Sequence, residues 1–170
     1  GEIKEIHSEE HSYSCKALII ATGSEPKKLG VSGEEKFIGK GVSYCATCDG
    51  PFYKDKVVAV VGGGNSALEE AIFLTKFTKL VTIIHRREEL RADKVLQDKA
   101  KANPKIFFRL HSILEEILGD SSVKSIKLKD TLTNKISSVN VDGVFIYAGN
   151  IPITDFIKYT IKLDNNGYII

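Results

Sequence analysis

An uninterrupted apolar run at residues 57–61 opens the most regular part of the chain. Runs of this kind, rich in β-branched residues and without polar alternation, are typical of a parallel strand buried on both faces. Three glycines follow, and residues 66–77 then show apolar positions at a helix-compatible spacing among alanine and glutamate. A second apolar run at 80–84 predicts another strand, so the pattern reads strand, glycine turn, helix, strand.

The same alternation continues through the next segment. Residues 88–102 are charged but carry apolar residues at helical spacing, which predicts a helix that Pro104 ends; a third strand begins at residue 106. Parallel strands need a crossover connection, and a helix on the sheet face usually provides it. The order of elements therefore predicts an α/β fold with a Rossmann-like, doubly wound parallel sheet.

The pattern changes after residue 110. Short strands are expected at 113–118, 123–128 and 136–141, and the turn signals between them predict an antiparallel β-meander. Residues 143–147 form a further apolar run, which we expect to return to the main sheet.

Less regular segments precede this pattern. Residues 1–14 are polar with alternating isoleucines, which predicts an edge hairpin or a loose strand. Residues 17–21 are an apolar run stopped by Thr-Gly-Ser, the pattern of a buried strand followed by a turn. Residues 27–41 are rich in glycine and charge and predict a linker.

Composition narrows the class of protein. The 170 residues are 42% hydrophobic and 27% charged, which is ordinary for one globular domain, or one domain with pieces of another. The net charge of +2 is too balanced to predict a nucleic-acid partner. No apolar run is long enough for a transmembrane helix, and no leader pattern opens the chain. Three cysteines favour a reducing, cytoplasmic compartment, and a start at Gly1 without any methionine predicts a piece of a longer protein.

A glycine-rich turn joins the first predicted strand to the first helix. Gly62, Gly64 and Ala67 form a Gly-x-Gly-x-x-Ala motif, in which the first glycine permits a tight turn and the second lets the backbone approach a pyrophosphate. The start of the helix favours an anion, and Ser66 adds a hydroxyl donor beside Asn65. Alone the motif also fits an ordinary turn, but inside a strand–helix–strand unit it predicts dinucleotide binding.

Basic residues follow the second strand, where NAD-binding folds usually carry an acidic side chain about 20 residues beyond the glycines. Arg86 lies 22 positions after Gly64, next to Arg87, and Arg91 follows one predicted helical turn later. Arginines bind a 2′-phosphate through paired N–H donors, so the pattern predicts NADPH rather than NADH. The plainer alternative is a solvated basic helix start, although cations there oppose the helix dipole unless an anion compensates them.

Cys45 and Cys48 form a Cys-Ala-Thr-Cys pair just before the first strand of the unit. Two thiols at this spacing can close a small disulfide ring and reopen it by thiolate attack, and Asp49 beside them could supply or accept the proton. Zinc is the main alternative. Its other ligands would come from Cys15, His7, His11, His85 and His111. Because a second Cys-x-x-Cys is absent, we predict no metal site.

Taken together, the motifs resemble the bacterial-type, low-molecular-weight thioredoxin reductases. The resemblance rests on Cys-Ala-Thr-Cys-Asp-Gly at 45–50, Gly-Gly-Gly-Asn-Ser-Ala at 62–67 and His-Arg-Arg at 85–87, in that order. In addition, Ala-Thr-Gly at 21–23 resembles a strand end in that family's flavin domain, and residues 143–149 resemble the strand that closes its NADPH domain.

By this resemblance, NADPH would give a hydride to FAD, and reduced flavin would reduce the Cys45–Cys48 disulfide. Cys48 would face the flavin, Cys45 would attack thioredoxin or a related small disulfide protein, and Asp49 would be the acid–base group. The full-length parent would be a homodimer. The implied NADPH-binding residues are Gly62, Gly64, Asn65, Ser66, His85, Arg86, Arg87, Arg91 and Gly149, and those at the rim of the FAD site are Thr22 and Gly23.

The resemblance also implies a division of the chain. Residues 1–28 would end the first FAD-domain segment, residues 29–150 would be the NADPH-binding domain with the dithiol, and residues 151–170 would start the second FAD-domain segment. The family's amino-terminal FAD motif is absent, so we expect this chain alone to retain no FAD and to show no turnover. Three alternatives stay open: an alkyl hydroperoxide reductase-type flavoprotein, an NADP-binding module without a redox role, and a small zinc-binding module.

Overall fold

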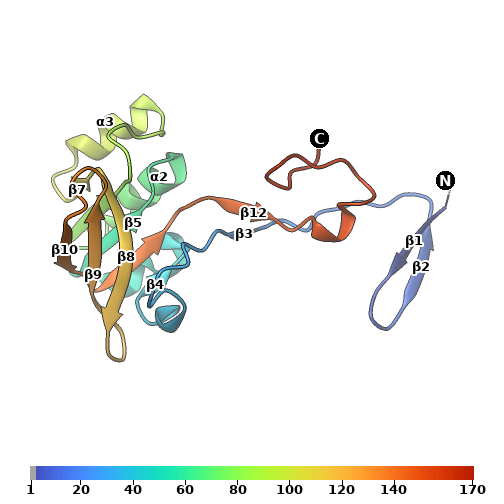
Figure 1. The fold of residues 1–170 in the computed structure, drawn as a ribbon, viewed down its shortest axis with the longest axis horizontal. Helices are drawn as coiled ribbons and strands as arrows, with labels where there is room; N and C mark the ends of the chain where they lie inside the picture. Colours follow the sequence, from blue (N-terminus) through green and yellow to red (C-terminus); the bar gives the residue numbers. More distant parts are fainter. Residues whose placement is uncertain (1–2) are drawn as a thin grey trace. The chain divides into compact units, whose positions relative to one another are not determined.

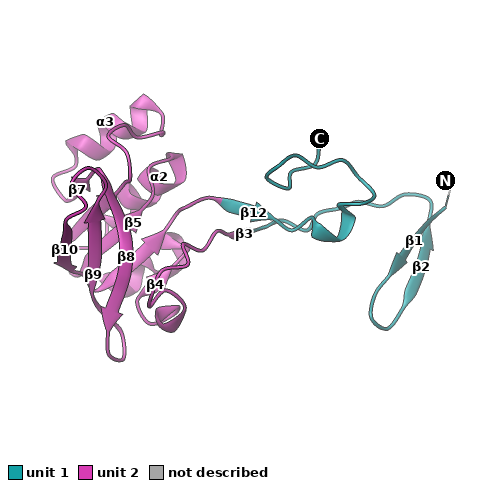
Figure 2. Ribbon diagram, viewed as in Figure 1, with its two compact units in different colours: residues 1–25, 150–170 teal, residues 26–149 magenta. Residues whose placement is uncertain are grey.

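A five-stranded parallel sheet forms the centre of residues 26–149, and a computed structural model describes residues 3–170 of the chain (Figure 1). Contacts between residues separate this part from a second unit made of segments 1–25 and 150–170 (Figure 2). The strand order in the sheet is β4-β11-β5-β6-β7. The bounds are Val42–Ser43 for β4, Gly143–Ile146 for β11, Val57–Val61 for β5, Leu80–Ile84 for β6 and Ile106–Arg109 for β7.

Helices cover one face of this sheet and an antiparallel meander covers the other. Alternate residues of β5 show the division, because Val58 packs in a cluster with the helices whereas Ala59 packs in a cluster with the meander. The helices are α2, Asn65–Leu74, and α3, Lys94–Ala102. The meander consists of β8, Ser112–Gly119, β9, Val123–Asp130, and β10, Ile136–Asn140. The three predicted meander strands and the return of β11 to the main sheet are confirmed; the second face of the sheet carries the meander in place of helices.

Short elements connect β4 to β5 and precede β4. They are η1, Glu35–Phe37, α1, Ala46–Asp49, and η2, Gly50–Tyr53. The unit formed by the chain's two end segments holds a hairpin and a second small sheet, with one short helix. Its elements are β1, Lys4–His7, β2, Ser12–Cys15, β3, Ser24–Pro26, β12, Asn150–Pro152, and η3, Asp155–Ile157.

The strand predicted at residues 17–21 is wrong. These residues form no strand, and Leu18 and Ile19 are 45% and 90% exposed. An apolar run becomes a buried strand only when other layers cover both its faces. Among the described residues of this unit, the sheets are two-stranded ribbons that provide no such cover.

The helix predicted over residues 88–102 starts later than expected, at Lys94. The preceding loop gives its backbone donors to the glycine loop instead of to a helical ladder. The N–H groups of Arg91 and Ala92 donate to the carbonyl oxygen of Gly63 at 2.7 and 3.0 Å. The arginines therefore do not lie at a helix start, and the argument that a helix dipole repels them is wrong.

Residues 27–41, predicted as a linker, contain part of the core. Phe37 is 1% exposed, and the carboxylate of Glu34, equally buried, accepts the N–H groups of Leu29 and Gly30 at 3.0 and 2.7 Å. The hydroxyl of Tyr44 donates to the same carboxylate at 2.7 Å. A buried charge is tolerated when donors surround it in this way. Glycine and charged residues thus form a turn held by hydrogen bonds here, where the sequence predicted a linker.

Candidate active site

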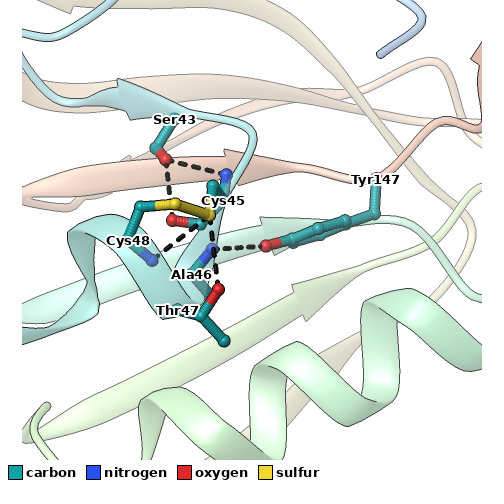
Figure 3. The surroundings of a disulfide bond; sticks show 6 residues. All are labelled: Ser43, Cys45, Ala46, Thr47, Cys48 and Tyr147. Carbon is teal, nitrogen blue, oxygen red and sulfur yellow. Dashed lines mark hydrogen bonds between the residues drawn. A yellow bond between two sulfur atoms is a disulfide. The ribbon is translucent and has the colours of Figure 1, made fainter. Parts of the chain in front are cut away.

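A closed disulfide joins Cys45 to Cys48 across the single turn of α1 (Figure 3). The turn is shaped by local hydrogen bonds. The hydroxyl of Ser43 accepts the N–H of Cys45 at 3.0 Å, and Cys45 Sγ accepts the N–H of Cys48 at 3.2 Å. Cys48 is exposed and Cys45 is half-buried, so the pair lies at the surface, where a thiol–disulfide partner has access to it.

Tyr147 holds the same turn from the end of β11. It follows β11 directly, and its hydroxyl oxygen accepts the N–H of Ala46 at 2.8 Å (Figure 3). Burial raises the pKa of Tyr147 above its ordinary value, and the negative charges of Glu70 and Asp49 raise it further. The hydrogen bond from Ala46 lowers this pKa but does not outweigh the other causes. The hydroxyl is therefore neutral at physiological pH.

Two carboxylates lie in this region. Asp49, half-buried at the end of α1, contributes to the raised pKa of Tyr53, for which burial is the larger cause. Burial also raises the pKa of Glu70, with a smaller contribution from Glu69. Glu70 Oε2 is buried and has no hydrogen-bond partner among the described residues. A carboxyl group beside a disulfide, as Asp49 is beside Cys48 in the chain, is chemically suited to take or give the protons that thiol formation requires.

The glycine loop between β5 and α2 has a distinct requirement at each position. Gly62 has φ +153°, and a Cβ there would come within 2.7 Å of the Tyr147 carbonyl oxygen. A Cβ on Gly63 would come within 2.3 Å of His85 Nδ1, whereas a Cβ on Gly64 would meet nothing within 4 Å. Two glycines are thus required by close packing inside the protein, and the third borders open space. That space lies at the start of α2, where no side chain caps the free N–H groups.

A cavity of about 240 Å³ lies beside this loop. Its wall includes Gly62 and Gly63 from the loop, His85, Arg86 and Arg91 from the segment after β6, and Tyr147. The guanidinium groups of both arginines make no ion pair with any described residue. Free cations at a cavity edge, together with uncapped helix N–H groups, form an arrangement that fits a phosphate-containing ligand.

His85 is buried in the wall of this cavity. Its Nε2 lies 3.1 Å from the carbonyl oxygen of Glu89, and because a carbonyl only accepts, Nε2 carries the proton. Burial is the main cause that lowers the pKa of His85, and the positive charges of Arg91, Arg86 and Arg87 lower it further. The hydrogen bond to the Glu89 carbonyl raises this pKa but does not outweigh the other causes. The ring is therefore neutral at pH 7.

Other residues singled out in the sequence lie around the cavity without lining it. Ser66 is exposed in the first turn of α2, and Arg87 is exposed beside Arg86. The side-chain amide of Asn65 makes two 2.8 Å hydrogen bonds to Asp93. These bonds connect the segment between β6 and α3, which carries the arginines, to the start of α2 beside the glycine loop. Gly149 has φ +109°, and its carbonyl oxygen accepts the N–H of Lys27 at 2.9 Å.

The remaining two predicted residues, Thr22 and Gly23, belong to the unit of the chain's end segments. The Thr22 hydroxyl donates to the carbonyl oxygen of Ile153 at 2.6 Å, and the Ile153 N–H donates to Gly23 at 3.0 Å. Both residues line a cavity of about 420 Å³ in that unit, together with Pro152 and Tyr168.

No three or more histidine, cysteine or acidic side chains in residues 3–170 are grouped so as to hold a metal ion. None of the helices found in this range is long and apolar enough to span a bilayer.

Comparison with known proteins identifies the class. The chain matches the pyridine nucleotide-disulphide oxidoreductase family over residues 2–170, and it belongs to that family of flavin- and pyridine-nucleotide-dependent oxidoreductases. Within the family it is similar to proteins named thioredoxin reductase. It is 47% identical to the one from Peptoclostridium acidaminophilum and 46% identical to the one from Listeria innocua, covering 100% and 99% of this chain but 56% and 53% of those proteins. The chain thus spans about half the length of the curated relatives it matches.

Solved structures agree with this assignment. The crystal structure of Lactococcus lactis thioredoxin reductase in its FR conformation superposes with a TM-score of 0.94 at 40% identity, covering 99% of this chain and 56% of that one. The thioredoxin reductase of T. acidophilum gives 0.89 at 40% identity, covering 97% and 55%. The resemblance to thioredoxin reductases and the Rossmann-like fold class are confirmed.

Sequence reasoning missed Tyr147 and Glu70 as members of the site. Tyr147 stood only as the last residue of an apolar strand, and its partner Ala46 lies 101 positions earlier. Glu70 sits in a Glu-Glu pair on a helix, which usually indicates a solvated face. A polar tip at the end of an otherwise apolar strand is the one signal that could have marked Tyr147.

Proposed function

We propose that this chain carries the NADPH site and the redox-active dithiol of a thioredoxin reductase. The observation that supports the proposal most strongly is the closed Cys45–Cys48 disulfide, held by Tyr147, a residue that also lines the cavity with the glycine loop. An isolated nucleotide-binding module would have no need of a surface disulfide at this position. A zinc module would need both cysteines as free thiolates.

The residues present fit a phosphorylated dinucleotide. The open space at Gly64 gives a pyrophosphate room beside the N–H groups that start α2. Arg86, Arg87 and Arg91 would hold the 2′-phosphate, with Ser66 and the neutral His85 as further hydrogen-bonding groups. A carboxylate, which would favour NADH, does not occupy the position that Arg86 takes.

Reduction of the disulfide needs two electrons and two protons. NADPH would supply the two electrons and one proton as a hydride, FAD when bound would relay the electrons to Cys45–Cys48, and the second proton would come from solvent, so that the sulfur–sulfur bond opens to two thiols. Asp49 would exchange the proton at the pair, Cys48 would face the flavin, and the thiolate of Cys45 would attack the disulfide of thioredoxin or a related small protein. Attack forms a mixed disulfide, which Cys48 then resolves by closing the Cys45–Cys48 bond again.

The FAD site would be completed by residues outside this chain. Thr22 and Gly23 line the cavity in the unit of the end segments and would form one rim of that site. A homodimeric parent that acts on thioredoxin belongs to the same proposal. The chain alone is expected to purify colourless, because one rim gives FAD too few contacts.

Calorimetric titration of the chain with NADP⁺ and NAD⁺ tests the nucleotide assignment. Charge-assisted hydrogen bonds to phosphate contribute about 1.5–3 kcal/mol each. The double variant Arg86→Glu/Arg87→Glu should therefore weaken NADP⁺ at least tenfold while changing NAD⁺ less than threefold. Lys99→Glu, an exposed reversal on α3, is the matched control and should change neither. Equal weakening of both nucleotides by the double variant would refute the 2′-phosphate site.

A further inference from the structure

Tyr147 contacts both halves of the candidate active site. Tyr147 is one of the residues that line the 240 Å³ cavity, beside Gly62 and His85. Its hydroxyl accepts the N–H of Ala46, 2.8 Å away, inside the Cys45–Cys48 turn (Figure 3). No other residue that lines this cavity has a hydrogen bond to that turn among the bonds of the described residues.

The glycine loop lies directly against the same tyrosine. A Cβ on Gly62 would come within 2.7 Å of the Tyr147 carbonyl oxygen and 3.3 Å of its Cβ. The backbone of Tyr147 is also held to the end of β5, because its N–H donates to Val61 at 2.8 Å. In close-packed protein, a small shift of one group is passed to its neighbour and not absorbed by empty space. A ligand that moves the loop therefore moves Tyr147.

The bond at Ala46 controls the peptide next to the attacking sulfur. The N–H of Ala46 belongs to the peptide group that joins it to Cys45, so the hydroxyl fixes the orientation of that peptide while the disulfide is closed. The hydroxyl is neutral, because burial and the charges of Glu70 and Asp49 raise the pKa of Tyr147. It therefore keeps a proton to donate while it accepts from Ala46.

We propose that Tyr147 is a positioning residue that transmits occupancy of the cavity to the redox equilibrium of the Cys45–Cys48 pair. The bond it makes is present with the disulfide closed, and we expect it to weaken when the two sulfurs separate, so that it stabilises the oxidised form. A ligand in the cavity shifts Tyr147 through its contact with the glycine loop and thereby changes that stabilisation. The nature of the nucleotide rests on the proposed function, whereas the contact between Tyr147 and Ala46 does not.

The first test uses the 170-residue chain without nucleotide, FAD or thioredoxin. Dithiothreitol gives two electrons and two protons to the pair, closing its own sulfurs into a cyclic disulfide as the Cys45–Cys48 bond opens to two thiols. The reduced fraction at each ratio of reduced to oxidised dithiothreitol is read by thiol alkylation and mass measurement. Tyr147→Phe keeps the ring and removes the hydroxyl. It should make the pair about threefold to tenfold easier to reduce, the range expected for one hydrogen bond.

Tyr53→Phe is the matched control. It removes a hydroxyl from another half-buried tyrosine whose pKa Asp49 also raises, but Tyr53 has no hydrogen bond to the dithiol turn among the described residues. It should leave the equilibrium within twofold of the parent chain. A Tyr147→Phe equilibrium within twofold of the parent, or a pair that becomes harder to reduce, overturns the proposal. A general loosening of the core would move both variants alike and would also overturn it.

The second test repeats the equilibrium with saturating NADP⁺. The parent chain should shift at least twofold on binding, and Tyr147→Phe should bind NADP⁺ within threefold of the parent but show no shift. A parent chain that binds NADP⁺ without any shift overturns the coupling. A chain that does not bind NADP⁺ by calorimetry refutes the proposed nucleotide and the coupling, while the first test still decides whether the hydroxyl positions the dithiol.

Discussion

Two adjacent glycines in the same loop should respond oppositely to alanine, because one faces the protein and the other faces open space. A Cβ on Gly63 would come within 2.3 Å of Nδ1 and 2.5 Å of Cε1 of His85. His85 is 6% exposed, and its Nε2 is engaged with Glu89, so the ring has little room to retreat. A Cβ on Gly64 would meet nothing within 4 Å, and its φ of −93° suits any residue.

The magnitudes follow from those contacts. Forcing a methyl into a packed site costs about 1–3 kcal/mol, so Gly63→Ala should lower the free energy of unfolding by that amount. Gly64→Ala loses a little as a helix cap and gains about 0.4–1 kcal/mol by restricting the unfolded chain. Its stability should stay within about 0.5 kcal/mol of the parent. Its methyl, however, stands where the pyrophosphate would approach, and about 1.4 kcal/mol of crowding weakens binding tenfold.

Urea unfolding and NADP⁺ calorimetry of both variants provide the assay. We expect Gly63→Ala to be the less stable variant and Gly64→Ala to be folded like the parent with at least tenfold weaker binding. If Gly64→Ala binds NADP⁺ as the parent does, the pyrophosphate does not lie at the start of α2. If Gly63→Ala unfolds at the parent's urea concentration, the close approach of the loop to His85 does not restrain the chain.

Two further predictions concern buried charge. Glu34→Gln replaces a carboxylate that accepts two backbone N–H groups and a tyrosine hydroxyl, so it should lower the free energy of unfolding in urea by about 2–3 kcal/mol. Glu35→Gln, a change at the exposed neighbour, is the control and should cost under about 0.5 kcal/mol. Equal costs would contradict the stabilising role of the Glu34 hydrogen bonds. The pKa of His85 is lowered from 6.5 in the folded chain, so the unfolded chain binds a proton at this residue first as the pH falls. The contribution of the neutral His85 to the free energy of unfolding is therefore complete above pH 6.5 and is lost as the pH falls through the folded pKa. Unfolding free energies measured between pH 7.5 and 5 should fall less steeply in His85→Gln, and parallel profiles would show that His85 is not the group responsible.

Local patterns in the sequence were sufficient to predict the strands in which every residue is buried or half-buried. The apolar runs at 57–61 and 80–84 coincide with β5 and β6, and the glycine motif falls between β5 and α2. Strands buried on both faces leave a continuous apolar signal, which needs no knowledge of their neighbours. The cysteine spacing likewise allowed a disulfide, although it also allowed half of a zinc site.

Elements that depend on distant partners were misjudged. Residues 88–93 have helical spacing, yet two of the loop's N–H groups bond to Gly63, and its last residue, Asp93, bonds to Asn65. Residues 17–21 have the pattern of a buried strand, but the described residues around them provide no covering layer. Propensity and spacing report what a segment can form by itself, and tertiary hydrogen bonds or missing cover can override either.

The sequence by itself determined the parallel sheet, the glycine loop, the basic positions after β6 and the presence of a dithiol, because each of these is a local pattern of residue types. Only the tertiary structure decided that the dithiol turn and the cavity share Tyr147, and that Glu34 is buried in a turn held by hydrogen bonds. Those facts depend on pairs such as Ala46 and Tyr147, 101 positions apart, which meet because β11 lies between β4 and β5 in the sheet. Strand order is a property of the folded sheet, and no periodicity along the chain encodes it.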